Sequence, residues 1–244
     1  MKDIKQIVKS KYSKIATSQS PCGCSCSCSN KKSVSGAIGY TDEQLKTVGE
    51  ADLGLGCGNP TAFSHIKNGD VVLDLGSGAG IDCFLAAKKV GPKGKVIGID
   101  FTKEMIGRAE ANAVKGNYHN VEFILGDIER LPLEDNSVDI IISNCVINLA
   151  PNKQKVFSEA QRVLKPGARM YVSDIVLLAE LTPEQRSNRE LIAGCVAGAL
   201  LKNDYIKLME KAGFQVKILS ENKDISKQQY QNIPLESLMI EAIK

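Results

Sequence analysis

Strand-like and helix-like segments alternate through the middle of this chain, and this alternation restricts the fold more than any other feature. Short apolar runs at 71–75, 95–100, 121–124 and 138–143 are typical of buried strands, and helical spacing of apolar residues follows them. A fifth strand is expected at 169–174. Alternation of this kind predicts a doubly wound, mostly parallel, Rossmann-like α/β sheet with helices on both faces.

The amino-terminal part has a different character. Residues 1–17 place apolar side chains at helical spacing between lysines, which predicts an amphipathic helix laid on the main body; a basic RNA-binding arm is the alternative. Residues 18–35 are polar and rich in cysteine, and we expect a loop there. We therefore divide the chain into a helical and cysteine-rich segment, 1–50, and a main domain, 51–244.

Capping signals place two further helices. Thr41 and Thr182 each begin a Thr-x-x-Gln capping box. We expect the second helix to carry Leu191, Ile192, Cys195, Val196 and Ala199 on one face, and we expect closing strands at 214–219 and 238–243.

Charge and hydropathy exclude several classes of function. Lys and Arg total 31 against 28 acidic residues, and this net charge of +3 gives no electrostatic reason to expect a nucleic acid partner. No apolar run approaches the length of a membrane span, so we expect no membrane association and a cytoplasmic protein. Eight cysteines in a cytoplasmic α/β chain favour metal or thiol chemistry over a disulfide framework.

A glycine-rich loop follows the first predicted strand. Gly76, Ser77, Gly78 and Gly80 belong to a Gly-x-Gly-x-Gly pattern at a point where the chain must turn sharply and allow a ligand to approach the backbone. The spacing differs from the Gly-x-Gly-x-x-Gly pattern of dinucleotide sites, and no phosphate-binding loop is present. The loop therefore favours a nucleoside without phosphates.

Acidic residues end the next two predicted strands. Asp100 lies where a carboxylate can accept hydrogen bonds from ribose hydroxyls, and Asp127 with Ile128 follows the third strand, close to where an adenine would lie. The alternative is that these are ordinary turn glycines and strand-end aspartates of another doubly wound protein.

Residues 70–175 resemble the class I S-adenosylmethionine-dependent methyltransferases in the order of these three motifs. The resemblance implies that Asp74 lies near the methionine amino group of the cofactor, that Asp100 holds the ribose, and that Asp127 and Ile128 contact the adenine. It implies a cofactor site that also includes Gly76, Ser77, Gly78, Phe101, Met105 and Asn144.

Three isolated cysteines have separate sequence contexts. Cys145 follows the fourth strand, where the strand order of such a sheet reverses and ligands bind. Cys57 lies between two glycines before the first strand, and Cys195 has glycines close on both sides. A buried structural cysteine is the alternative for Cys145, and a packed core thiol is the better interpretation of Cys83.

These contexts resemble the arsenite methyltransferases: Gly-Cys57-Gly, Ser-Asn-Cys145-Val-Ile-Asn-Leu and Gly-Cys195-Val-Ala-Gly-Ala-Leu. The resemblance implies that the three are catalytic thiolates that hold trivalent arsenic, with Cys22 or Cys24 as a redox partner of Cys57 and a possible arsenic ligand. It also implies an external reductant, either a glutathione-type thiol or thioredoxin. Arsenous acid and three thiols condense to a neutral trithiolate, and its arsenic lone pair is the nucleophile for methyl transfer.

Four further cysteines alternate with small residues in the amino-terminal segment. The pattern suits capture of soft ions or redox exchange, and it lacks the Cys-x-x-Cys pairs of zinc sites. Incidental copper or zinc binding and the absence of a defined role are the alternatives for Cys22, Cys24, Cys26 and Cys28.

Two other functions are compatible with the motifs. A methyltransferase for a small carbon or oxygen acceptor, such as a quinone precursor or a sterol, would have a similar fold, although it leaves the three cysteines unexplained. A metalloid-binding protein without turnover would keep the thiols but show no methyl transfer.

Overall fold

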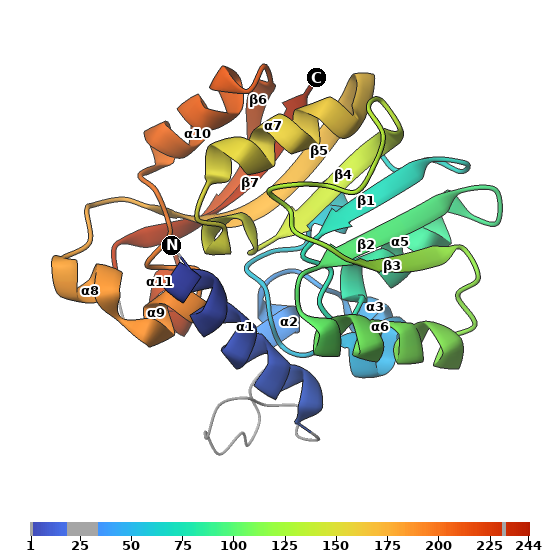
Figure 1. Cartoon of the computed structure of the whole chain (residues 1–244), viewed down its shortest axis with the longest axis horizontal. Helices are drawn as coiled ribbons and strands as arrows, with labels where there is room; N and C mark the ends of the chain where they lie inside the picture. The colour runs from blue at the N-terminus through green and yellow to red at the C-terminus, as the bar shows by residue number, and fades with distance from the viewer. Residues whose placement is uncertain (1, 19–33, 231–232) are drawn as a thin grey trace.

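A computed structural model of the chain describes residues 2–18, 34–230 and 233–244. Its centre is a seven-stranded sheet with the order β3-β2-β1-β4-β5-β7-β6 (Figure 1). The strands β3, β2, β1, β4 and β5 are parallel, and β7 runs antiparallel to both β5 and β6. The strands are β1 (Val71–Leu75), β2 (Lys95–Asp100), β3 (Val121–Leu125), β4 (Val138–Asn144), β5 (Leu164–Leu177), β6 (Gln215–Asn222) and β7 (Leu235–Ile243).

Helices cover both faces of the sheet, and apolar cores lie between the layers. On one face α5 packs its buried residues against β1, β2 and β4. On the other face α7 and α10 pack against β4, β5 and β7. The helices are α1 (Lys2–Thr17), α2 (Val34–Ala37), α3 (Asp42–Val48), α4 (Pro60–Phe63), α5 (Ile81–Val90), α6 (Lys103–Lys115), α7 (Lys153–Val163), α8 (Pro183–Ser187), α9 (Arg189–Ala193), α10 (Lys202–Lys211) and α11 (Ile225–Gln229), with 3-10 helices η1 (Gly49–Ala51) and η2 (Ile147–Leu149).

The parallel strands confirm the predicted fold, and alternate residues of each strand enter different cores. In β1, Val72 packs with α5 whereas Leu73 packs with the opposite layer. Strands buried on both faces explain the continuous apolar runs of the sequence. Among the helices in the described parts of the chain, none has the length and apolar character needed to cross a membrane.

Helix α1 confirms the predicted amphipathic helix and lies against α6 and α9 (Figure 1). Val8 on its inner face is only 1% exposed. At its end, the Arg108 guanidinium from α6 donates hydrogen bonds to the carbonyl oxygens of Ala16 and Ser18, at 3.1 and 3.3 Å. These bonds satisfy carbonyl groups that a helix end leaves without partners.

The prediction of one helix from Thr182 through Ala199 is wrong. Both capping boxes form, but α8 ends before Asn188, whose side chain accepts hydrogen bonds from the backbone of Glu190 and Leu191 and begins a second helix, α9. Cys195 lies beyond α9 with a φ of 67°, in the left-handed region. A capping side chain in mid-segment is the physical reason for the break.

Candidate active site

A cavity opens at the carboxyl ends of β1 and β4, where the strand order reverses. This is the position at which open α/β sheets bind ligands. Helix α1 forms part of its wall through Val8 and Tyr12. The predicted residues that line it are Asp74, Gly76, Ser77, Gly78, Asp100, Phe101, Asn144 and Cys145.

An adjoining hollow extends this cavity and shares Gly76, Asp100 and Phe101 with it. Asp127 and Ile128 line the extension, as does Lys5 of α1. The Lys5 ammonium forms ion pairs with Asp127 at 2.5 Å and with Glu129 at 2.9 Å. Of the predicted cofactor residues only Met105 lines neither space, because it is fully buried on the inner side of α6.

The glycine loop has little room for side chains at Gly76 and Gly80, whereas Gly78 faces open space. Gly76 has a φ of 71°, and a Cβ atom there would lie 2.3 Å from Cγ2 of Val146. Asp100 joins this loop to the end of β2, because its carboxylate accepts hydrogen bonds from the backbone N–H of Gly78 at 3.1 Å and of Thr102 at 2.8 Å. The loop is thereby held in a fixed shape around the cavity.

Two buried carboxylates face the same cavity. Asp74 and Asp82 are each 3% exposed. Burial raises the pKa of Asp82 to about 6, and burial together with the Asp82 charge raises the pKa of Asp74 well above its usual range. Tyr40 donates a hydrogen bond to Asp82 at 2.8 Å, and the Cys83 thiol donates one to Asp74 at 3.3 Å. A buried pair of like charges favours a cationic ligand group beside it.

Sequence reasoning missed Asp82 and Tyr40. The available signal was the position of Asp82 in the first turn of the helix that follows the glycine loop, where a side chain can face the same ligand. No local signal links Tyr40 to that carboxylate, because 42 residues separate the two.

Asn144 connects the cavity to the Cys57 loop. Its side-chain amide donates hydrogen bonds to the Tyr40 hydroxyl at 2.9 Å and to the Gly58 carbonyl at 2.7 Å. Its carbonyl oxygen accepts one from the Cys57 backbone N–H at 3.1 Å. The end of β4 therefore positions the loop that carries Cys57.

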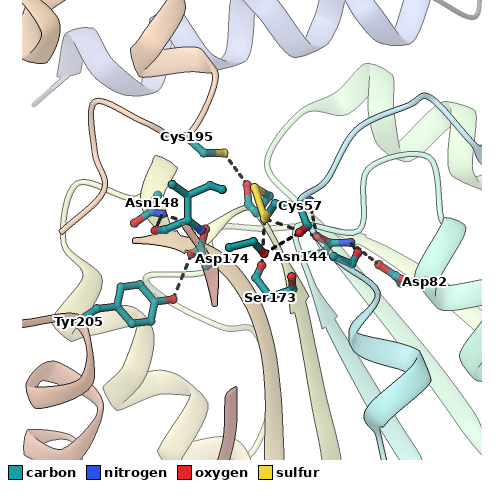
Figure 2. The surroundings of a disulfide bond; sticks show 12 residues. Cys57, Asp82, Asn144, Asn148, Ser173, Asp174, Cys195 and Tyr205 are labelled. Atoms are coloured by element: carbon teal, nitrogen blue, oxygen red, sulfur yellow. Dashed lines mark hydrogen bonds between the residues drawn. A yellow bond between two sulfur atoms is a disulfide. The ribbon is translucent and has the colours of Figure 1, made fainter. Parts of the chain in front are cut away.

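Cys145 lines this cavity, and the other two isolated cysteines, Cys57 and Cys195, contact Cys145 (Figure 2). Cys57 and Cys145 form a disulfide, with their Cα atoms 5.8 Å apart. The Cys195 thiol donates a hydrogen bond to the Cys145 carbonyl oxygen at 2.7 Å. Both Cys145 and Cys195 have positive φ, at 57° and 67°. Non-glycine residues adopt this conformation rarely, and it occurs preferentially at functional sites.

A buried carboxylate, Asp174, lies beside this sulfur cluster. One of its oxygens and the sulfur atoms of Cys57 and Cys145 all lie within 4.8 Å of one another. Asn148 and Tyr205 donate hydrogen bonds to it, at 2.9 and 3.1 Å (Figure 2). Burial raises the pKa of Asp174 to about 7. Sequence reasoning missed Asp174, although this residue lies near the carboxyl end of β5, the strand next to β4.

The remaining cysteines have different surroundings. Burial and the nearby Asp174 charge raise the pKa of the Cys195 thiol, so this thiol is protonated at neutral pH. Cys83 is fully buried and free, within the core formed by α5. The amino-terminal cysteines lie outside the described residues, and the disulfide of Cys57 to Cys145 differs from the pairing with Cys22 or Cys24 that the family resemblance implies.

The fold and cavity define a class I methyltransferase domain. The family described as "Methyltransferase domain" matches residues 66–213. The chain is 46% identical over 225 residues to an arsenite methyltransferase of Halobacterium salinarum. The match covers 87% of this chain and 58% of that protein. It is 43% identical over 162 residues to a human arsenite methyltransferase, covering 62% and 42% of the two chains.

A solved structure gives the same result. The arsenic(III) S-adenosylmethionine methyltransferase of Chlamydomonas reinhardtii superimposes with a TM-score of 0.64 at 36% identity, covering 88% of this chain and 74% of that one. The chain belongs to the arsenite methyltransferase family. It spans about half the length of the curated relatives it matches.

Proposed function

We propose that this protein transfers methyl groups from S-adenosylmethionine to trivalent arsenic bound by Cys57, Cys145 and Cys195. The observation that carries this proposal is that Cys145, which lines the cofactor cavity, is joined to Cys57 by a disulfide and accepts a hydrogen bond from the Cys195 thiol at its backbone carbonyl. The arsenite methyltransferase relatives support the same acceptor. A methyltransferase for a quinone precursor or a sterol would not need three sulfur atoms at this position.

The cavity fits the cofactor by the chemistry of its walls. Ser77 lines it, and its buried hydroxyl oxygen has no hydrogen-bond partner among the described residues. Asp74 and Asp82 would hold the methionine ammonium group, and Asp100 would hold the ribose. When bound, the cofactor supplies an electrophilic sulfonium methyl group. Asp127 and Ile128 would contact the adenine, which requires that Lys5 and adenine share the space beside Asp127.

The thiols fit arsenic as a substrate. Soft arsenic prefers sulfur over oxygen ligands, and a trithiolate of As(III) is neutral, so its burial costs little. Methylation oxidises arsenic formally from As(III) to As(V), and closure of two thiols to a disulfide returns two electrons. Cys57 and Cys145 are the two thiols that would supply these electrons, because they form the disulfide. An external thiol, of the glutathione or thioredoxin type, must then reduce that disulfide before the next arsenic binds.

Arsenic speciation tests the proposal directly. The protein is incubated with S-adenosylmethionine, arsenite and a reducing thiol, and the arsenic species are separated by chromatography with elemental detection. We expect methylated arsenic only when all three components are present. Arsenic that binds in a 1:1 ratio but stays unmethylated would instead indicate a sequestering protein.

Replacing Cys57 by serine is expected to separate two substrates. Arsenite needs three thiols, whereas monomethylarsenite needs two, and Cys145 and Cys195 remain adjacent in this variant. We expect the rate with arsenite to fall by about 100-fold or more and the rate with monomethylarsenite to stay within about threefold. The rates are compared in single-turnover assays, because this variant cannot form the disulfide of Cys57 and Cys145 that would return two electrons to arsenic. Equal loss with both substrates would contradict the assignment of Cys57 as the third ligand.

Cofactor affinity is expected to fall as the pH is lowered. The pKa of Asp82 is about 6, so acid protonates the carboxylates that would face the methionine ammonium group. Binding of a cation favours the ionised form, and the affinity should drop by up to about tenfold per pH unit below pH 6. Calorimetric titration with S-adenosylhomocysteine between pH 5 and 8 measures this slope. We expect Asp82→Asn to bind more weakly at pH 8 and to flatten the profile; an unchanged slope would exclude Asp82.

A further inference from the structure

A second cavity lies next to the disulfide, on the sheet face opposite α10. Alternate side chains of β7 point to opposite faces of the sheet. Leu238 packs in the core with α10, whereas Ser237 and Met239 line this cavity. The cavity has a volume of about 310 Å³. Its rim includes the exposed residues Phe63 of α4 and Ser220 of β6, so it opens to the surface.

The disulfide separates this second cavity from the cofactor cavity. Cys57 lines the second cavity but not the cofactor cavity, whereas Cys145 lines the cofactor cavity but not the second one. Among residues 2–18, 34–230 and 233–244, none lines both spaces. Each sulfur of the disulfide therefore belongs to a residue that faces a different space.

The walls of the second cavity are uncharged and partly polar. Ser173 lines it and is fully buried, and within the part of the chain that the structure describes its hydroxyl oxygen has no hydrogen-bond partner. The Cys57 sulfur lies 3.4 Å from the Ser173 carbonyl oxygen, and the Ser237 hydroxyl donates a hydrogen bond to the Cys57 carbonyl at 2.6 Å. An unpaired buried hydroxyl beside a disulfide sulfur is a potential donor to an incoming thiolate.

We propose that this second cavity admits a low-molecular-weight reducing thiol, which attacks Cys57 from the side away from the cofactor. The thiolate forms a bond to the Cys57 sulfur, the bond between Cys57 and Cys145 breaks, and Cys145 leaves as a thiolate facing the cofactor cavity. A second thiol then attacks the mixed disulfide, which releases the oxidised reductant and the Cys57 thiolate. Two external thiols thus supply the two electrons.

This inference rests on the proposed function, because it places reduction of the disulfide after the methylation step that forms it. Its consequence is that the reductant and the cofactor reach the disulfide by separate routes. Reduction can therefore take place while S-adenosylhomocysteine still occupies the cofactor cavity. The cavity shape favours a small thiol over a protein surface, because Cys57 is only 2% exposed.

The first test measures disulfide reduction by glutathione with and without saturating S-adenosylhomocysteine. Samples are quenched with acid, alkylated and mapped by mass spectrometry. We expect the rate to change by less than about twofold, and we expect glutathione to be trapped on Cys57. Blocked reduction, or trapping on Cys145, would show that the thiol arrives through the cofactor cavity and would overturn the proposal. No arsenic is involved, so the outcome is independent of the methylation assay.

The second test narrows the rim of the cavity. Ser220→Trp places a large side chain at the opening and is expected to slow reduction by glutathione by about tenfold. Lys217→Trp adds the same side chain to an exposed position of β6 that lines neither cavity, and serves as the matched control. Phe63→Ala widens the rim and is expected to accelerate reduction. Equal rates in the Ser220 and Lys217 variants would overturn the proposal, provided that both bind S-adenosylhomocysteine normally.

A third arm identifies the source of the thiol. The same rates are measured with Cys22, Cys24, Cys26 and Cys28 all replaced by serine. We expect reduction to remain dependent on glutathione concentration and to remain slowed by Ser220→Trp. Loss of reduction in this background would assign the attacking sulfur to the chain itself and would overturn the proposal of an external thiol.

Discussion

Serine at position 145 is expected to abolish methylation of both arsenite and monomethylarsenite. Cys145 lines the cofactor cavity, contacts Cys195 and pairs with Cys57 in the disulfide. A hydroxyl is a much poorer ligand than a thiol for soft arsenic, and the loss also removes the acceptor from the position needed for transfer. We expect the rates to fall by about three orders of magnitude or more. Chromatographic arsenic speciation in initial-velocity assays measures the loss.

Two controls show whether this loss is specific. Serine is nearly isosteric with cysteine, so Cys145→Ser should bind S-adenosylhomocysteine within about threefold of the unmodified protein. Cys83→Ser removes a thiol that is buried against Asp74 and outside the sulfur cluster, and we expect it to retain arsenic binding. Full activity of Cys145→Ser with arsenite would remove this residue from the arsenic site.

Alanine at position 100 is expected to cause the largest loss of cofactor affinity. Asp100 is 8% exposed and accepts backbone hydrogen bonds from Gly78 and Thr102, which hold the glycine loop. Its removal eliminates the proposed ribose acceptor and leaves two backbone donors without their partner. Together these losses correspond to about 3 kcal/mol, or an affinity for S-adenosylhomocysteine about 100-fold weaker in calorimetric titration.

The matched control for this change is Asp204→Ala. Asp204 lies on α10, its side chain is 58% exposed, and it lines neither cavity. We expect its affinity for S-adenosylhomocysteine to be unchanged. An Asp100→Ala variant that binds as tightly as this control would show that the ribose does not lie beside β2.

The two variants should also fail in different ways. Cys145→Ser should lose arsenic binding and keep the cofactor, whereas Asp100→Ala should lose the cofactor and keep the three thiols. This contrast distinguishes an enzyme from a sequestering protein, because methylation requires both sites in one molecule. In a protein that only binds arsenic, Asp100→Ala would leave arsenic binding, its one function, unchanged.

The central strands could be predicted from the sequence because the signals are local. The runs at 71–75 and 95–100 combine apolar, often β-branched residues with flanking turn signals, and these strands form as expected. The segment after Thr182 could not be predicted in the same way. There the capping side chain of Asn188 ends one short helix and begins another, and it leaves Cys195 in a left-handed turn.

Side chains that complete the site were outside the reach of local patterns. Asp82 needs Tyr40 as a donor, and Asp174 needs Tyr205 and Asn148. Each partner comes from a different element, so only the packing of layers brings the groups together. Met105 shows the opposite case, because it follows the β2 motif closely but its helix turns it into the core.

The sequence by itself determined the alternating fold, the glycine loop and the presence of three thiols suited to arsenic, because each depends on residues close together in the chain. Only the tertiary structure decided which sulfur atoms meet. Cys57 and Cys145 are separated by 88 residues, and they pair because Asn144 at the end of β4 anchors the Cys57 loop. The parallel strands bring their carboxyl ends to one edge, and this geometry places the thiols beside the cofactor cavity.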